Sequence, residues 1–253
     1  MPYAILRFKK RKAGSVASCE RHNERKKEAY KSNPDIDIGR SKENYHLVPP
    51  PRYTYKKEIN RMVAEAGCKV RRDSVMMVET LITASPEFMN SLPPAEQKEY
   101  FTEALDFISE RVGRQNILSA VVHMDEKTPH MHLSFVPLTK DGRLSAKEIV
   151  GNKKKLTRWQ DEFWQHMVKQ YPELERGESA SQTGREHIPP RIFKEMTQLT
   201  KQKEQLDALL VGINPFNGKS RAAEISKLLD SYIPNVARMK DQLRKYNVAF
   251  TKT

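Results

Sequence analysis

The amino-acid sequence predicts an α+β fold: a two-layer domain with a mainly antiparallel central sheet, helices on one face of that sheet, and an α-helical C-terminal arm. Two observations support this prediction. Strand-like and helix-like segments alternate along residues 1–190, and two of the strands are close enough in sequence to form a hairpin. From residue 191 onward the apolar residues adopt the spacing of long helices. We therefore expect a globular domain at 1–190 and a helical arm at 191–253.

The first elements of the domain follow from capping residues, prolines and apolar spacing. Ser15 is a residue type that caps helices, and a segment of helical character follows it. Prolines and a glycine interrupt residues 32–51 and exclude a long regular element there. Residues 75–84, with the sequence VMMVETLITA, have the apolar and β-branched character of a buried strand. The expected elements are a strand at 3–8 with a basic exit at 7–12, a helix from 15 to about 30, a loop at 32–51, a helix at 55–67 and the strand at 75–84.

The later elements of the domain are a helix, a hairpin and a second helix. The first helix follows Pro94, and its apolar residues recur at helical spacing. Two apolar, β-branched runs at 116–122 and 131–136 predict the two strands of the hairpin. The last helix covers about 153–171, and we expect its aromatic residues in the core instead of forming a base-stacking platform. The residues expected to be buried by the two helices are Phe101, Leu105, Ile108 and Val112, and Leu156, Trp159, Phe163 and Met167.

The arm is predicted from a repeat of apolar residues after a polar linker at 173–190. Residues 214–218, with the sequence NPFNG, break the arm into two helices, and Pro234 predicts a kink or a stop in the second one. The pattern fits a coiled coil that joins two copies of the chain and equally fits an intramolecular helical hairpin. The apolar positions are Ile192, Met196, Leu199, Leu206 and Leu210 in the first helix, and Ile225, Leu229, Tyr232, Val236, Met239, Leu243 and Tyr246 in the second.

Charge and cysteine content restrict the class of protein. The chain of 253 residues carries 45 lysines and arginines against 32 acidic residues, a net charge of +13, which indicates a polyanionic partner such as nucleic acid. No apolar run reaches the length of about 20 residues that a membrane span needs, and no signal peptide is expected. Cys19 and Cys68 lie far apart in the sequence and form no CxxC motif. These features predict a cytoplasmic, nucleic-acid-binding protein.

The segment from His123 to His132 predicts a metal site. His130 and His132 are two residues apart on one strand, so they share a face, and His123 on the paired strand completes a triangle of imidazoles. Three neutral imidazoles bind a divalent ion and leave coordination positions open for chemistry. The alternative interpretation is three structural histidines around a turn. Glu126 is a candidate for orienting a ligand, for weak coordination or for a general base, whereas Asp125 is interpreted as a turn former.

Two further groups of residues have weaker patterns. On a continuous helix His22, Arg25 and Lys26 would share a face, with a neutral histidine beside two phosphate-binding cations. The alternative is a solvated basic helix face. Asn44 and Tyr45, in the proline-rich loop, are of the types that hydrogen-bond and stack an unpaired base.

Together these motifs resemble those of the Mob/Pre plasmid mobilisation and recombination proteins, the MobV relaxases, within the class of histidine-hydrophobic-histidine endonucleases. The resemblance covers about residues 1–190. It rests on three motifs in the order typical of the family: His22-Asn23-x-Arg25, Asn44-Tyr45, and His123-x-Asp125-Glu126-x-x-Pro129-His130-x-His132.

The resemblance implies a catalytic domain that nicks one strand of plasmid DNA at the origin of transfer and stays attached to the 5′ phosphate. It implies His123, His130 and His132 as ligands of Mn²⁺ or Mg²⁺, His22 as the nucleophile that forms a phosphoramidate, and Glu126 as a supporting catalytic residue. Arg25 and Tyr45 would contact DNA. The implied partners are single-stranded or hairpin origin DNA, a coupling protein of a conjugation system, and a second copy of the chain bound through the arm. Our candidate DNA contacts are Arg25, Lys26, Asn44, Tyr45, Arg71, Arg72 and Arg114.

Three alternatives remain open at this point. A rolling-circle replication initiator uses a related metal hairpin, with a tyrosine on a later helix, and the helix at 153–171 has only Tyr171 at its end. A non-catalytic DNA-binding regulator could retain the same hairpin. Tyr30 or Tyr45 could replace His22 as the nucleophile.

Overall fold

The computed structural model describes all residues except 1, 28–29, 31–32, 34, 178–189 and 245–253, and the side chains of 190–191, 193–194 and 242–244 also lie outside the description. The chain divides into two compact units, Met1–Glu178 and Ser179–Thr253. We predicted the boundary at residue 190, which is later in the chain than this division and coincides with the start of the first helix of the arm. We describe each unit separately.

The first unit contains a five-stranded antiparallel sheet with the strand order β1-β3-β5-β4-β2. The α+β fold with an antiparallel central sheet is therefore confirmed. The two strands of the predicted hairpin, β4 and β5, are adjacent near the centre of the sheet. The strands are β1 (Ala4–Lys12), β2 (Tyr45–Val48), β3 (Val75–Ala84), β4 (Ile117–His123) and β5 (His130–Phe135).

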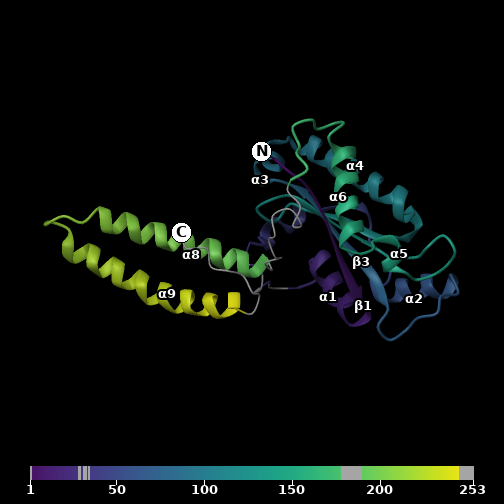
Figure 1. Ribbon diagram of the computed structural model, residues 1–253, viewed down its shortest axis with the longest axis horizontal. Helices are drawn as coiled ribbons and strands as arrows, with labels where there is room; N and C mark the ends of the chain where they lie inside the picture. The colour runs from purple at the N-terminus through teal and green to yellow at the C-terminus, as the bar shows by residue number, and fades with distance from the viewer. Residues whose placement is uncertain (1, 28–29, 31–32, 34, 178–189, 245–253) are drawn as a thin grey trace. The chain divides into compact units, whose positions relative to one another are not determined.

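The two faces of the sheet carry different chemistry because successive residues of a strand point to opposite sides. On one face Val78 and Ile82 of β3 belong to the main apolar core, which helices α4 (Pro94–Val112) and α6 (Lys153–Met167) cover. On the other face Met77 packs with helices α1 and α2 in a smaller core. Figure 1 shows the two pairs of helices on opposite sides of the sheet. The predicted two-layer arrangement is present on the first face, and α1 (Ala13–Asn23) and α2 (Tyr55–Glu65) add a partial layer on the second.

The main core is rich in aromatic side chains that contact one another edge to face. Phe107 of α4 lies 5.4 Å from Phe163 and 6.0 Å from Trp159 of α6, measured between ring centroids. Tyr100 contacts Tyr171 at 5.3 Å, so the tyrosine at the end of α6 is a core residue. Trp159, Phe163 and Met167 are buried as predicted, but Leu156, in the first turn of α6, is exposed. Shorter helical segments complete this unit: η1 (Ile38–Glu43), α3 (Pro86–Ser91), η2 (Arg114–Asn116) and α5 (Ala146–Ile149).

Three predictions about the N-terminal elements were wrong in their bounds. Strand β1 continues through the basic segment to Lys12, because each of its residues has a partner in β3, and Arg11 forms an ion pair with Glu79. Helix α1 ends at Asn23 instead of near residue 30. The proline-rich segment contains an edge strand, β2, where we expected only a loop. Proline is tolerated next to an edge strand, since no ladder hydrogen bond is lost there.

The second unit is a helical hairpin of α8 (Pro190–Val211) and α9 (Gly218–Arg244). The break between them lies at the predicted position, where Asn214 accepts hydrogen bonds from two backbone amides. Ile192 and Met239 are buried between the helices, as the apolar spacing predicts. The predicted stop at Pro234 is wrong: α9 continues through this exposed residue. Leu243 and Tyr246 lie outside the described side chains. Among the described helices, none combines the length and apolar character of a membrane-spanning segment.

We predict that the contact between α4 and α6 contributes strongly to the stability of the first unit. Phe163 is fully buried, so Phe163→Ala should lower the free energy of unfolding by about 3–5 kcal/mol through lost burial and a cavity. The measurement is urea denaturation followed by circular dichroism. Tyr53→Ala, which removes an aromatic ring that is 59% exposed, is the control and should change the midpoint little. Equal effects of the two substitutions would contradict this assignment of the core.

Candidate metal and nucleophile site

Three imidazoles form a triangle on the face of the sheet that α1 covers. His123 of β4 and His130 of β5 are directly paired, and His132 lies two residues further along β5. The ring centroids are 5.3 Å apart for His123 and His130, 4.8 Å for His123 and His132, and 5.0 Å for His130 and His132. The structure therefore brings together the three histidines that the sequence singled out, and strand alternation with direct pairing is the reason.

Each imidazole has one ring nitrogen turned toward a protein acceptor. Nε2 of His123 donates to the backbone carbonyl of Asn23 at 2.8 Å, and Nδ1 of His130 donates to the carbonyl of Thr128 at 2.9 Å. Nδ1 of His132 lies 3.3 Å from Oε1 of Glu79. Because a carbonyl only accepts, Nε2 of His123 and Nδ1 of His130 carry the proton, and the opposite nitrogen of each ring keeps a lone pair. The contact between His132 and Glu79 is an ion-pair contact without hydrogen-bond geometry.

These residues fit a divalent metal ion. Burial, and next the neighbouring imidazoles, lowers the pKa of His123, and burial likewise lowers the pKa of His130, so both rings are neutral at physiological pH. Nδ1 of His123 is buried and has no hydrogen-bond partner among the described residues, as expected of an atom that faces a metal. Two overlapping groups, His22 with His123 and His132, and His123 with Glu126 and His130, have ligand atoms within 4.8 Å of one another. Imidazole nitrogens suit ions such as Zn²⁺ or Fe²⁺, and the carboxylate of Glu126 is a ligand type that suits Mn²⁺ and Mg²⁺.

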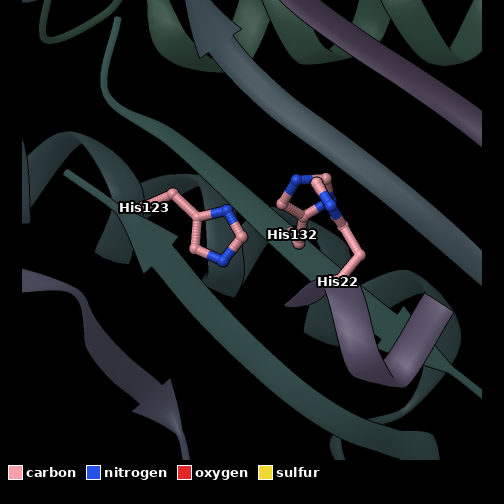
Figure 2. A group of neighbouring side chains, drawn as sticks. All are labelled: His22, His123 and His132. Atoms are coloured by element: carbon pink, nitrogen blue, oxygen red, sulfur yellow. The ribbon is translucent and has the colours of Figure 1, made fainter. Parts of the chain in front are cut away.

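His22 lies beside this triangle, at the C-terminal end of α1. Its ring centroid is 5.1 Å from that of His132 and 5.8 Å from that of His123. Figure 2 shows His22 extending from its helix toward His132. Burial, followed by the nearby His132 and Arg25, lowers the pKa of His22 to about 4. The side chain is therefore neutral near pH 7 and has a lone pair available for attack.

Arg25 does not have the position that we predicted. The helix ends before it, and Arg25 has a φ of 47°, in the left-handed region, so it does not share a helix face with His22. Its guanidinium makes two hydrogen bonds to Asp125, at 2.7 and 2.8 Å, and a third to Glu126 at 2.9 Å. Its side chain is only 9% exposed. Arg25 is thus an internal ion-pair partner. Because its guanidinium is buried and bound to carboxylates, it is badly placed to contact a DNA phosphate directly.

Asp125 has a larger role than a turn former. It is fully buried and accepts hydrogen bonds from Arg25, from the hydroxyl of Ser41 at 2.7 Å and from the amide of Asn44 at 2.9 Å. Burial raises the pKa of this carboxyl, but the hydrogen bonds outweigh it and lower the pKa to about 2. The amide oxygen of Asn44 also accepts from the backbone N–H of Met124. Asn44, which we predicted to contact DNA, therefore holds the hairpin loop.

Glu126 borders the same triangle. Its two oxygens accept hydrogen bonds from Arg25 at 2.9 Å and from Asn33 at 2.8 Å, and Oε1 lies 3.6 Å from Nε2 of His130. Burial raises the pKa of Glu126, while the contacts with His130, Asn33 and Arg25 outweigh it and lower the pKa. An ionised carboxylate held in this way can support a ligand or coordinate an ion.

Tyr45 lies on the opposite face of the sheet. It pairs with Val122, and both contact the main core, where the Tyr45 hydroxyl is buried and burial raises its pKa to about 12. The aromatic residue of β2 on the site face is His46, which pairs with Val121 and binds Glu24 at 2.8 Å. Tyr45 is thus badly placed for DNA contact or nucleophilic attack. The hydroxyl of Tyr30 donates to the carbonyl of Arg21 and accepts from the amide of Lys27.

The remaining cations that we predicted to contact DNA are not gathered at the site. Lys26 is half-exposed and binds Glu20 at 2.7 Å. Arg71 and Arg72 precede the start of β3, and Arg114 precedes the start of β4. Ile117 and His123 are six positions apart on one strand, a span of about 20 Å. These three arginines therefore lie toward the end of the sheet away from the imidazoles.

The sequence reasoning missed two charged residues of the site, Arg11 and Glu79. Glu79 of β3 is 6% exposed and faces His132, and Arg11 of β1 binds its other oxygen. Burial raises the pKa of Glu79, but His132 and Arg11 together outweigh it and lower the pKa. The available signal was a glutamate in the middle of an otherwise apolar strand.

The first unit has a fold similar to that of relaxase domains of known structure. The chain matches a MobM relaxase domain (MOBV; Mob_Pre), solved with Mn and bound to oriT DNA of plasmid pMV158, at a TM-score of 0.71 and 34% identity over 77% of this chain and 98% of that domain. A second structure of that domain, bound to a 26-nucleotide oriT DNA, matches at a TM-score of 0.60 and 30% identity over 74% and 97%.

Residues 1–195 match the Mob_Pre family, described as plasmid recombination enzyme. A plasmid recombination enzyme of Bacillus thuringiensis is 35% identical over 98% of this chain and 54% of its own length. A type 1 plasmid recombination enzyme of Staphylococcus aureus is 39% identical over 81% of this chain and 52% of its own length. The chain belongs to the plasmid recombination enzyme family. It spans about half the length of these relatives.

We predict that the Arg25–Asp125 pair stabilises the first unit because both side chains are buried. Asp125→Asn should lower the free energy of unfolding by about 3 kcal/mol, since it leaves the Arg25 charge without full compensation. Chemical denaturation measures this change. Asp141→Asn, which breaks the exposed pair with Arg143, is the matched control and should leave the midpoint in place. A wild-type midpoint for Asp125→Asn would show that the buried pair is energetically neutral.

Proposed function

We propose that this chain is a relaxase that nicks and rejoins one strand of plasmid DNA at the origin of transfer, through a covalent link to the 5′ phosphate, in conjugative mobilisation and plasmid recombination. Membership of the plasmid recombination enzyme family supports this proposal, as does the similar relaxase domain bound to oriT DNA. The observation that carries it is the position of a neutral His22 beside the imidazoles of His123 and His132 on one face of the sheet.

We assign His22 as the nucleophile. The lone pair of its imidazole attacks the phosphorus, a P–N bond forms, and the bond to the 3′ oxygen breaks. The proton that the ring N–H gives up balances the proton that the departing 3′ oxygen takes up. The phosphoramidate conserves the energy of the phosphodiester, so the reverse attack by a 3′ hydroxyl reseals the strand without ATP.

We assign His123, His130 and His132 as the residues that hold a divalent metal ion, with Mn²⁺ favoured and Mg²⁺ as the alternative. Support comes from the neutral, oriented imidazoles and from the Mn-bound structures of the similar domain. A bound ion supplies Lewis acidity, which neutralises charge on the phosphate oxygens. The three imidazoles lie 4.8–5.3 Å apart between ring centroids, and burial lowers the pKa of His123 and of His130, which keeps competing protons off these two rings.

Glu126 is assigned a supporting catalytic role at the border of this triangle. It keeps its charge through Arg25 and Asn33 and lies next to His130. Lys26, whose side chain is 51% exposed, is assigned to contact DNA close to His22. Arg71, Arg72 and Arg114 are assigned only to DNA that extends toward the far end of the sheet.

The geometry argues against one alternative, and an experiment tests the other. A replication initiator of this type needs a tyrosine near the metal, but Tyr171 is in the core and Tyr45 faces away from the imidazoles. A non-catalytic regulator would bind DNA without nicking it, which the adduct experiment below tests. We also propose two protein partners: a coupling protein of a conjugation system, and a second copy of this chain bound through the α8–α9 hairpin. In that hairpin Ile192 and Met239 are buried and Met196 and Leu199 pack against them, whereas Leu210 is exposed.

We predict that nicking depends on the metal and on its ligands. Chelation with EDTA, or the substitution His132→Ala, should abolish cleavage of a supercoiled plasmid that carries the cognate origin, because the phosphate charge is no longer neutralised. Agarose gels measure nicking, and binding of the origin strand should persist through the basic surface. His166→Ala, on the opposite side of the domain, is the control. Nicking by His132→Ala at the wild-type rate would reject the metal assignment.

The nucleophile can be identified directly by mass spectrometry of the protein–DNA adduct. We expect the modified peptide to contain His22, and His22→Ala should form no adduct while it still binds Mn²⁺ and DNA. Tyr30→Phe keeps the ring beside His22 and should form the adduct. An adduct on Tyr45 or Tyr30 would overturn the assignment of His22, and the complete absence of nicking and adduct in the wild type would reject the proposed function.

A further inference from the structure

Glu79 differs from the groups that hold the other two imidazoles. His123 and His130 donate to backbone carbonyls, whereas the ring nitrogen of His132 faces a carboxylate oxygen at 3.3 Å. Leu81, two residues after Glu79, is the cross-strand partner of His132, so the two side chains lie diagonally on the same face of adjacent strands. A glutamate at this place in an apolar strand costs desolvation free energy that a neutral residue would not cost.

Arg11 determines how Glu79 is oriented. The guanidinium binds Oε2 of Glu79 through both Nη2 and Nε, at 2.5 and 3.0 Å. Oε1 is therefore left for His132. The side chains are 19% exposed for Arg11 and 8% exposed for Glu79, so water screens this pair weakly.

The same carboxylate lies next to the residue that follows His22. With its amide nitrogen turned toward acceptors, Asn23 lies 3.3 Å from Oε1 of Glu79 and 3.3 Å from the carbonyl of Cys19. The backbone carbonyl of Asn23 accepts the hydrogen bond from His123. Glu79 thus contacts one imidazole directly and lies close to the backbone that orients a second.

We propose that Arg11 and Glu79 form a positioning pair for the metal site: Glu79 fixes His132 as the Nδ1–H tautomer, so that Nε2 keeps its lone pair for the ion. This inference rests on the metal assignment made above. Neither residue touches the phosphate or the ion, so both act through His132. Carboxylates that hold a metal-ligating histidine in this way typically contribute about 10- to 100-fold to metal affinity.

The substitution Glu79→Gln keeps the size and shape of the side chain but changes the group that faces His132. The single amide oxygen should face the charged guanidinium of Arg11, which leaves the NH₂ group toward Nδ1 of His132. A donor at that position favours the Nε2–H tautomer, which cannot bind an ion. We therefore expect the affinity of the purified protein for Mn²⁺ to fall about 10- to 100-fold, measured from the electron paramagnetic resonance signal of free Mn²⁺.

A second readout does not require metal. Long-range ¹H–¹⁵N spectra of the metal-free protein report the tautomer of each imidazole. His132 should be the Nδ1–H form in the wild type and should shift toward the Nε2–H form in Glu79→Gln. Arg11→Lys keeps the charge but loses the fork geometry, and it should weaken Mn²⁺ binding in the same direction by a smaller factor. This milder variant provides the test if Glu79→Gln does not fold.

Glu20→Gln is the matched control. Glu20 is also a buried carboxylate, 5% exposed, and it binds Lys26 and the backbone of Tyr55 without contacting a histidine. It should change stability but leave Mn²⁺ affinity and the His132 tautomer as in the wild type. Wild-type affinity and an unchanged tautomer in Glu79→Gln would overturn the positioning role while the metal site stands. Absence of Mn²⁺ binding in the wild type would instead overturn the metal assignment and this inference together.

Discussion

The site depends on one buried ion pair, between Arg25 and Asp125. Asp125 belongs to the loop between β4 and β5, and Arg25 belongs to the turn after α1, a hundred residues earlier in the chain. Arg25 has a left-handed backbone conformation that costs about 1–2 kcal/mol for a residue with a side chain. The two hydrogen bonds to a fully buried carboxylate offset that cost. The pair thus joins the turn that follows His22 to the hairpin loop between two of the histidines.

The orientation of the imidazoles is a second constraint, and it is met mainly by backbone. Buried neutral histidines are useful as ligands only if the correct nitrogen is protonated. In two of the three rings a backbone carbonyl determines which nitrogen carries the proton, and a carbonyl neither titrates nor becomes a donor. Since one of those carbonyls belongs to Asn23, the helix that carries His22 also orients His123. The proposed nucleophile and the proposed ligands are therefore parts of one connected structure.

The antiparallel sheet has the hydrophobic core on one face and the candidate site on the other. One face contains the large aromatic core with α4 and α6, and the opposite face of the same strands contains the histidines with their carboxylates. In β5, Met131 and Leu133 are fully buried in the core, while His130 and His132 alternate with them on the other side. A rigid, densely packed layer directly behind the site limits the movement of the strands, which keeps the ring-to-ring distances short.

The sequence by itself determined the fold class, the histidine hairpin and the two helices of the arm. These are local features, because strand alternation, turn residues and apolar spacing act over a few neighbours. Resemblance to a family added His22, whose spacing alone is weak. Only the tertiary structure decided that Arg25 binds Asp125, that Asn44 holds the loop, and that Glu79 and Arg11 adjoin His132. Each of these contacts joins residues far apart in the chain. The register of β2 also decided that His46, and not Tyr45, faces the site, since a shift of one residue moves a side chain to the other face of a sheet.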